Sequence, residues 1–158
     1  MIAMEKKDTS TDRIEKRFEV RAPRSKVWRA ISDAKQFSAW FGIAIEGQFV
    51  AGNTVPGKVM SKGYEHLQVE FQVQTIDPER YFAYRWHPYA NDPKVDYTAE
   101  PTTLVEFTLE ETAAGGGTEV TIVESGFDQI PLARRAEAFR MNDGGWVGQV
   151  KNLTKYVA

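Results

Sequence analysis

Cysteine is absent from the 158 residues, and histidine occurs only twice, at His66 and His87. Without cysteine the chain cannot form a disulfide, a thiol nucleophile, an iron–sulfur cluster or a cysteine-bound zinc site. Two histidines are also too few for a metal centre with three histidine ligands. We therefore expect no metal site and no cofactor.

The sequence also lacks an excess of charge of one sign and any long apolar run. Its 20 Lys and Arg face 22 Asp and Glu, for a formal net charge of −2, so phosphates are not attracted and nucleic acid is not an expected partner. No apolar run approaches the roughly 20 residues that cross a bilayer, and the first residues lack the apolar core of a signal peptide. We expect no membrane partner and a cytoplasmic location.

Two common catalytic motifs are missing as well. No Gly-x-Ser-x-Gly nucleophile turn occurs, and the glycines at 115–117 lack the Lys and Ser/Thr of a phosphate-binding loop. Nucleotide binding is therefore disfavoured.

What remains is the composition of one globular domain. Hydrophobic residues make up 42% and charged residues 27% of the chain, and a domain of this length buries roughly 70% of its unfolded surface. Residues 1–12 are polar and show no periodicity, which predicts a flexible leader. We expect a single domain over residues 13–158.

In the first part of this domain, the spacing of the apolar residues changes twice along the chain. Ile14, Phe18 and Val20 share one parity, which is typical of a half-buried strand. Apolar residues then recur at helical spacing between residues 22 and 41, which predicts two short helices with Asp33 as a cap between them. Turn-forming residues separate further predicted strands, which we place at residues 43–50, 55–61, 66–76 and 81–89.

The second part ends in a long helix. Residues 90–101 form a loop, either a lid or a solvated excursion, and we favour the excursion. Strands at residues 102–112 and 118–127 are joined by a glycine-rich hairpin, so the sheet is antiparallel. Apolar residues after Pro131 follow at steps of three and four, namely Leu132, Ala136, Phe139, Trp146, Val150, Leu153 and Val157. Gly144 and Gly145 interrupt this helix, which implies a kink or a close approach to the sheet or to a ligand.

Four segments in this order carry a family resemblance. They are Ala22–Asp33, Phe37–Gly42, Gly117–Phe127, and Gly145–Trp146 followed by Leu153. With them the chain resembles the START-like, Bet v 1-like (SRPBCC) superfamily, and within it the family of the C-terminal domain of the activator of the heat-shock-protein-90 ATPase.

This resemblance implies an α+β helix-grip fold. In that fold a curved antiparallel sheet of about seven strands wraps around a long C-terminal helix, two short helices follow the first strand, and a pocket lies under the long helix. Most bacterial-type members have no defined ligand. The eukaryotic co-chaperones carry a separate N-terminal domain that is not found in this sequence.

Two carboxylates stand out against the apolar pattern. Glu124 continues the inward parity of Val120 and Ile122, and a buried carboxylate needs donors or takes up a proton. Asp143 fills the step between Phe139 and Trp146 on the helix stripe. Alternatively, Glu124 reaches solvent at the strand end, and Asn142 and Asp143 cap a helix segment that restarts at the glycines.

The aromatic residues predict where the pocket lies. Phe82, Tyr84 and Trp86 share the face that we expect to look inward, which leaves His87 at the surface or rim. The predicted cavity is lined by Trp86, Phe107, Val120, Ile122, Glu124, Phe139, Asp143 and Trp146. Whether the two carboxylates face the interior separates a passive pocket from an active site.

Three functions follow as hypotheses. The first, which we favour, is binding of a small, largely apolar molecule by a monomer or a homodimer that is not an enzyme. The second is a cyclase or dehydratase that uses Glu124 and Asp143 as acid and base. The third is an interaction module for a chaperone partner, which rests on the family name.

Overall fold

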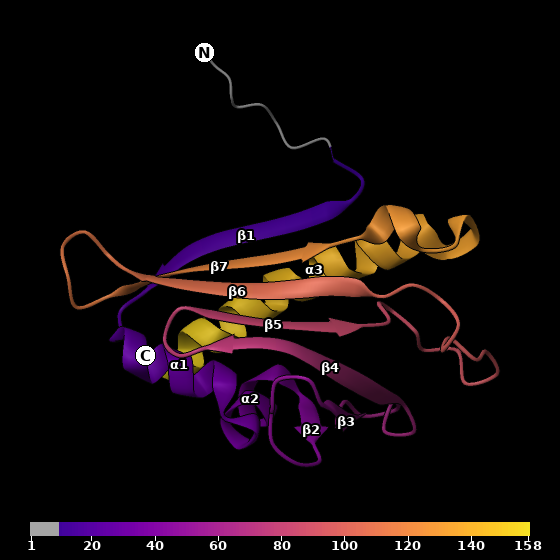
Figure 1. Cartoon of the computed structure of the whole chain (residues 1–158), viewed down its shortest axis with the longest axis horizontal. Coiled ribbons are helices and arrows are strands. Elements are labelled where there is room, and N and C mark those ends of the chain that lie inside the picture. The colour runs from indigo at the N-terminus through magenta and orange to yellow at the C-terminus, as the bar shows by residue number, and fades with distance from the viewer. Residues whose placement is uncertain (1–9) are drawn as a thin grey trace.

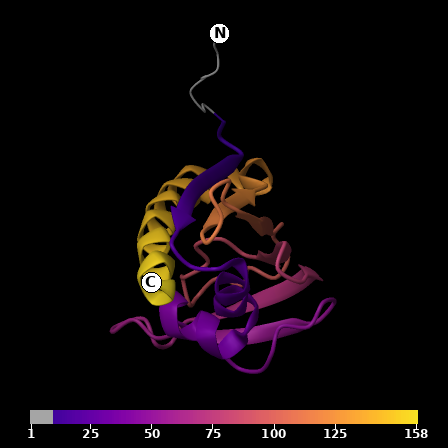
Figure 2. The same cartoon turned by 90° about the vertical axis from the view of Figure 1, so that its left-hand side faces the viewer.

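A computed structural model describes residues 10–158 and shows one curved sheet with a long helix along one side (Figure 1, Figure 2). The elements in chain order are β1 Arg13–Val20, α1 Arg24–Ser32, α2 Ala34–Phe41, β2 Ile43–Ile45, β3 Thr54–Val59, β4 Gln68–Asp77, β5 Tyr81–Trp86, β6 Thr103–Glu111, β7 Thr118–Ser125, the 3-10 helix η1 Phe127–Gln129 and α3 Leu132–Val157. The predicted helix-grip fold is confirmed.

The sheet has seven antiparallel strands in the order β1-β7-β6-β5-β4-β3-β2. Because the first strand pairs with the last, β7 lies between β1 and β6 and is hydrogen-bonded to a neighbouring strand on each edge. Side chains of even number on β7 therefore point into the buried face, which places Glu124 there beside Val120 and Ile122.

The two short helices are also confirmed. Asp33 is the N-cap of α2, and its carboxylate accepts from the backbone amides of Lys35 at 2.9 Å and Gln36 at 3.4 Å. Helix α2 ends at Gly42, whose φ of 85° favours glycine. The strand predicted at 43–50 is much shorter, because pairing with β3 ends at Ile45.

The core is largely aromatic. Phe37 contacts the rings of Phe41, Phe49, Phe71 and Tyr84, with centroids 4.4 to 6.4 Å apart. The concave side of the sheet is thus filled over much of its area by rings from α2, β4 and β5.

Helix α3 lies behind β7, β6 and β5 (Figure 1) and is continuous through Gly144 and Gly145. A Cβ atom added at either glycine would meet no atom within 4 Å, so a close approach to the sheet is not the reason for them. The predicted stripe is wrong at its start, because Leu132 is 77% exposed and Ala136 is also exposed. The rest of the stripe is correct, because Trp146, Leu153 and Val157 are buried and Phe139 and Val150 pack against the core. Ala138 and Asn142 are inward positions that the stripe does not include.

The predicted leader falls mostly outside the described residues. Of residues 1–12, the structure describes Ser10, Thr11 and Asp12. The carbonyl of Asp12 accepts from the amides of Gly126 and Phe127, and Thr11 donates to Asp128 at 2.7 Å. These contacts attach the start of β1 to the turn between β7 and α3.

Candidate functional site

Glu124 is the centre of a buried hydrogen-bond cluster. Its side chain is fully buried, so the parity of β7 predicts its direction correctly and the solvent-reaching alternative is wrong. The carboxylate accepts from the indole Nε1 of Trp86 and of Trp146, both at 2.8 Å, from Thr103 Oγ1 at 2.6 Å, and from Asn142 Nδ2 at 3.0 and 3.1 Å. We call these five residues the Glu124 cluster.

All four donors of the Glu124 cluster are uncharged. They come from three elements: Trp86 ends β5, Thr103 begins β6, and Asn142 and Trp146 are one helical turn apart on α3. An indole N–H can donate but cannot accept, and the same holds for an amide NH₂. The cluster therefore surrounds both carboxylate oxygens with donors and solvates a negative charge without a counter-ion.

Burial and hydrogen bonding act on this carboxyl in opposite directions. The pKa of Glu124 lies above its ordinary value of 4.5, because removal from water disfavours the charged form. Hydrogen bonds from the four donors lower the pKa and offset part of this rise.

The raised pKa of Glu124 makes the free energy of unfolding depend on pH in a defined direction. Between pH 4.5 and the raised pKa, the folded state holds a proton that the unfolded state has released. This contribution to stability is therefore complete below about pH 4.5 and is lost as the pH rises through the folded pKa. We expect the free energy of unfolding of the wild type, minus that of Glu124→Gln, to fall with rising pH in this window. Urea denaturation at a series of pH values measures the difference, and a rise with pH would contradict the raised pKa.

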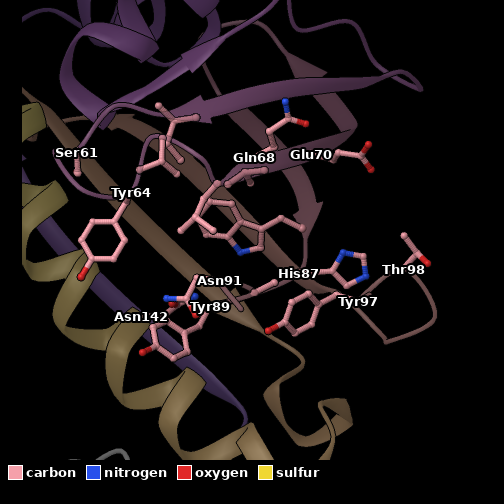
Figure 3. A pocket seen from close by; sticks show the side chains of 16 residues that line it. Ser61, Tyr64, Gln68, Glu70, His87, Tyr89, Asn91, Tyr97, Thr98 and Asn142 are labelled. Atoms are coloured by element: carbon pink, nitrogen blue, oxygen red, sulfur yellow. The ribbon is translucent and has the colours of Figure 1, made fainter. Parts of the chain in front are cut away.

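A groove opens beside the Glu124 cluster. This main groove has a volume of about 520 Å³ and runs between α3 at Asn142, the β3–β4 connection and the loop after β5 (Figure 3). It is lined by Ile43, Val59, Ser61, Tyr64, Leu67, Gln68, Val69, Glu70, Trp86, His87, Tyr89, Ala90, Asn91, Tyr97, Thr98 and Asn142. In Figure 3, Tyr64 lies on one side of the groove and His87 and Tyr97 on the other.

A smaller side recess of about 210 Å³ adjoins the main groove. Its lining residues are Phe41, Ile43, Trp86, Asn142, Gly145, Trp146 and Gln149. Ile43, Trp86 and Asn142 border both spaces. Three of the four donors to Glu124, namely Trp86, Asn142 and Trp146, thus also line a space that is open to a ligand.

The loop after β5 forms one wall of the main groove and is attached to α3 by Arg134. The guanidinium donates to Glu100 Oε1 at 2.7 and 3.0 Å, to the carbonyl of Pro88 at 2.7 Å and to that of Tyr89 at 3.3 Å. It also lies 4.8 Å from the centre of the Tyr97 ring. Tyr89 has a φ of 52°, a conformation unusual for a residue other than glycine, and these bonds hold it in place. The loop is therefore anchored at Pro88, Tyr89, Tyr97 and Glu100, while residues 92–96 between them are exposed, as the solvated excursion predicts.

The eight predicted cavity residues are distributed over four places. Trp86, Glu124 and Trp146 meet in the Glu124 cluster. Phe107, Val120 and Ile122 are fully buried in the core and line neither the main groove nor the side recess. Phe139 packs edge-on against Phe127, with ring centroids 5.1 Å apart.

Asp143, the eighth of them, is turned toward β1. Its carboxylate pairs with Lys16 Nζ at 2.8 Å, and its side chain is 47% exposed. The structure therefore does not bring Glu124 and Asp143 together as an acid and base pair.

Sequence reasoning missed several residues of the site. Asn142 was considered only as a cap, and Thr103 was not considered. Tyr64 and Tyr97 lie in connections, where their only signal is an aromatic ring in an otherwise polar segment. Tyr89 falls in the strand predicted at residues 81–89, but β5 ends at Trp86 and Tyr89 belongs to the loop after it. His87 lies at the groove rim as predicted, where its Nε2 is 3.0 Å from the carbonyl of Glu100.

Two further observations concern metal sites and membrane spans. Within residues 10–158, the acidic and histidine side chains form no group of three that could hold a metal ion. In the same part of the chain, no helix has the length and apolar character needed to span a membrane.

The family model described as "Activator of Hsp90 ATPase homolog 1-like protein" matches residues 21–158. Among solved structures, the protein MLL2253 from Mesorhizobium loti is 19% identical at a TM-score of 0.70, with 91% of this chain and 95% of that chain covered. The Aha1 dimer from Colwellia psychrerythraea is 16% identical at a TM-score of 0.69, with 92% and 95% covered. No curated protein matches the chain.

A third solved structure is DynU16, described as a putative protein in the dynemicin biosynthetic locus. It is 22% identical at a TM-score of 0.68, with 92% of this chain but only 46% of DynU16 covered. At these identities the likeness to all three structures concerns the fold.

Proposed function

The chain belongs to the family of Activator of Hsp90 ATPase homolog 1-like proteins, and from this premise we propose that it binds a small, largely apolar molecule in the main groove. The observation that carries the proposal is the pairing of an open groove with the Glu124 cluster beneath it. Trp86 and Asn142 belong to both.

The size and lining of the main groove support this function. Its volume falls within the range of about 300 to 1,000 Å³ that is typical of small-molecule sites. Aliphatic side chains of β2, β3 and β4 form one wall, and the rings of Tyr64, Tyr89 and Tyr97 stand around the opening. Such rings offer large contact areas with little loss of conformational freedom.

A few polar groups are placed to orient a ligand within this apolar wall. Gln68, Asn91 and Thr98 stand at the rim with His87, and Asn142 projects from α3. The fixed position of Asn142 follows from its two contacts with Glu124, so a ligand would meet a preorganised surface.

Binding is tested with a panel of apolar and aromatic compounds, scored by the shift of melting temperature and by calorimetry. We expect at least one compound to bind, and Val59→Trp to weaken it by tenfold or more, because an indole on the groove wall occupies the ligand's space. Val50→Trp is the matched control, since Val50 is 49% exposed and lies outside the groove. Equal binding by both variants would place the ligand elsewhere, and no binding by any compound would remove the proposal.

A further inference from the structure

The charge of the groove specifies the ligand further. We propose that the preferred ligand is an apolar or aromatic amine bound as its protonated cation, an inference that rests on the proposed binding function. The described lining residues of the main groove include one carboxylate, Glu70, and neither lysine nor arginine. An anionic end group would therefore find no counter-charge among them.

The arginine nearest the groove does not change this. Arg134 touches Tyr97 and the carbonyl of Tyr89, but its donors are directed at Glu100 and at the carbonyls of Pro88 and Tyr89. To pair with an incoming carboxylate, it would have to release the loop that forms the groove wall.

The indole rings at the base of the groove favour a cation. Trp86 directs its N–H at the buried carboxylate of Glu124, and Trp146 does the same from α3. A hydrogen bond to an anion polarises the indole and enriches its π face in electron density. Trp86 borders the main groove and the side recess, and Trp146 borders the side recess, so these rings are placed to contact a cation.

The ionised form of Glu124 acts in the same direction. Its four donors are neutral, so this form has no counter-ion within the cluster, and the side chains of Trp86 and Asn142 lie between it and the groove. At the rim, the carbonyl of Glu100 can only accept, so the Nε2 of His87 donates to it and does not offer its hydrogen to an anionic ligand.

The test is a matched series of three naphthyl compounds with different end groups: naphthylethylamine, naphthylethanol and naphthylacetate. Binding to the full chain is measured by calorimetry at neutral pH, in low and in high salt. We expect the amine to bind roughly threefold to thirtyfold more tightly than the alcohol, and naphthylacetate to bind most weakly. High salt should reduce the difference in affinity between the amine and the acetate.

Two variants locate the source of the preference. Glu124→Gln should reduce the advantage of the amine over the alcohol, whereas Glu111→Gln, with the same change of net charge at the opposite end of β6, should leave it unchanged. If Glu124→Gln does not fold, the relative affinities of the three compounds for the wild-type chain are sufficient to test the amine inference. Equal binding of the three compounds, or a preference for the acetate, overturns the amine inference and leaves the binding function intact. Binding by none of the three, together with none from the wider panel, removes both.

Discussion

Glu124→Ala should lower the free energy of unfolding by about 3–5 kcal/mol, the largest loss that we expect from any single substitution in this chain. The variant leaves two indole N–H groups, an amide and a hydroxyl without their acceptor in a fully buried place. Each buried donor without a partner costs about 1–3 kcal/mol, although water that enters the vacated space satisfies some of them.

A control for this loss lies on the same strand. Glu119 points to the opposite face of β7, where it stands between Glu19 of β1 and Glu110 of β6 in the register. Like charges directly opposite one another destabilise a sheet, so Glu119→Ala should be neutral or slightly stabilising. Urea denaturation of both variants measures the contrast, and similar losses for the two would show that the Glu124 cluster contributes no special stability.

The Glu124 prediction also shows which parts of the fold follow from local patterns. On β6 and β7 the side chains alternate strictly, and Val105, Phe107, Leu109, Val120, Ile122 and Glu124 are all buried. A shift of one residue would turn this whole set to solvent, so the period-two pattern predicts even the direction of a carboxylate. The neutral donors could not be predicted, because they come from β5, β6 and α3 and meet only in the folded chain.

The groove walls formed by connections between strands could not be predicted for a related reason. Their positions depend on tertiary contacts such as the one between Arg134 and Glu100. The sequence shows residues 90–101 as polar and aperiodic, which is equally typical of a free loop and of an anchored one. The anchor is an arginine on the first turn of α3, 34 residues further along the chain.

The predicted inward face of α3 is wrong at its start because a polarity pattern assigns every polar residue to the solvent-facing side. Arg134 donates to loop carbonyls, Arg135 donates to the carbonyl of Ile130 at 2.9 Å, and Asn142 donates to Glu124. These three polar side chains face protein, while Leu132 and Ala136 face solvent. The apolar pattern therefore predicts that Asp143 faces inward, although the residue that faces inward is its neighbour Asn142.

This difference of one position leads to the second large effect. Asn142→Asp would place a carboxylate where Nδ2 now lies, 3.0 Å from Glu124 Oε1. Two carboxylates at that distance in a buried site cannot both be ionised, so one must take up a proton. We expect the free energy of unfolding at neutral pH to fall by about 2–4 kcal/mol, because a donor is lost and the shared proton must be bound.

The matched change at the next residue should have little effect. Asp143→Asn removes the ion pair with Lys16, whose side chain is 24% exposed against 47% for Asp143, and such pairs contribute about 1 kcal/mol or less. Denaturation at neutral and at acidic pH separates the two variants. The loss in Asn142→Asp should shrink as the pH falls, because the folded pair binds a proton more tightly than the unfolded chain does. A larger loss for Asp143→Asn than for Asn142→Asp would instead mean that Asp143, as its place on the apolar stripe predicts, is the residue that faces Glu124.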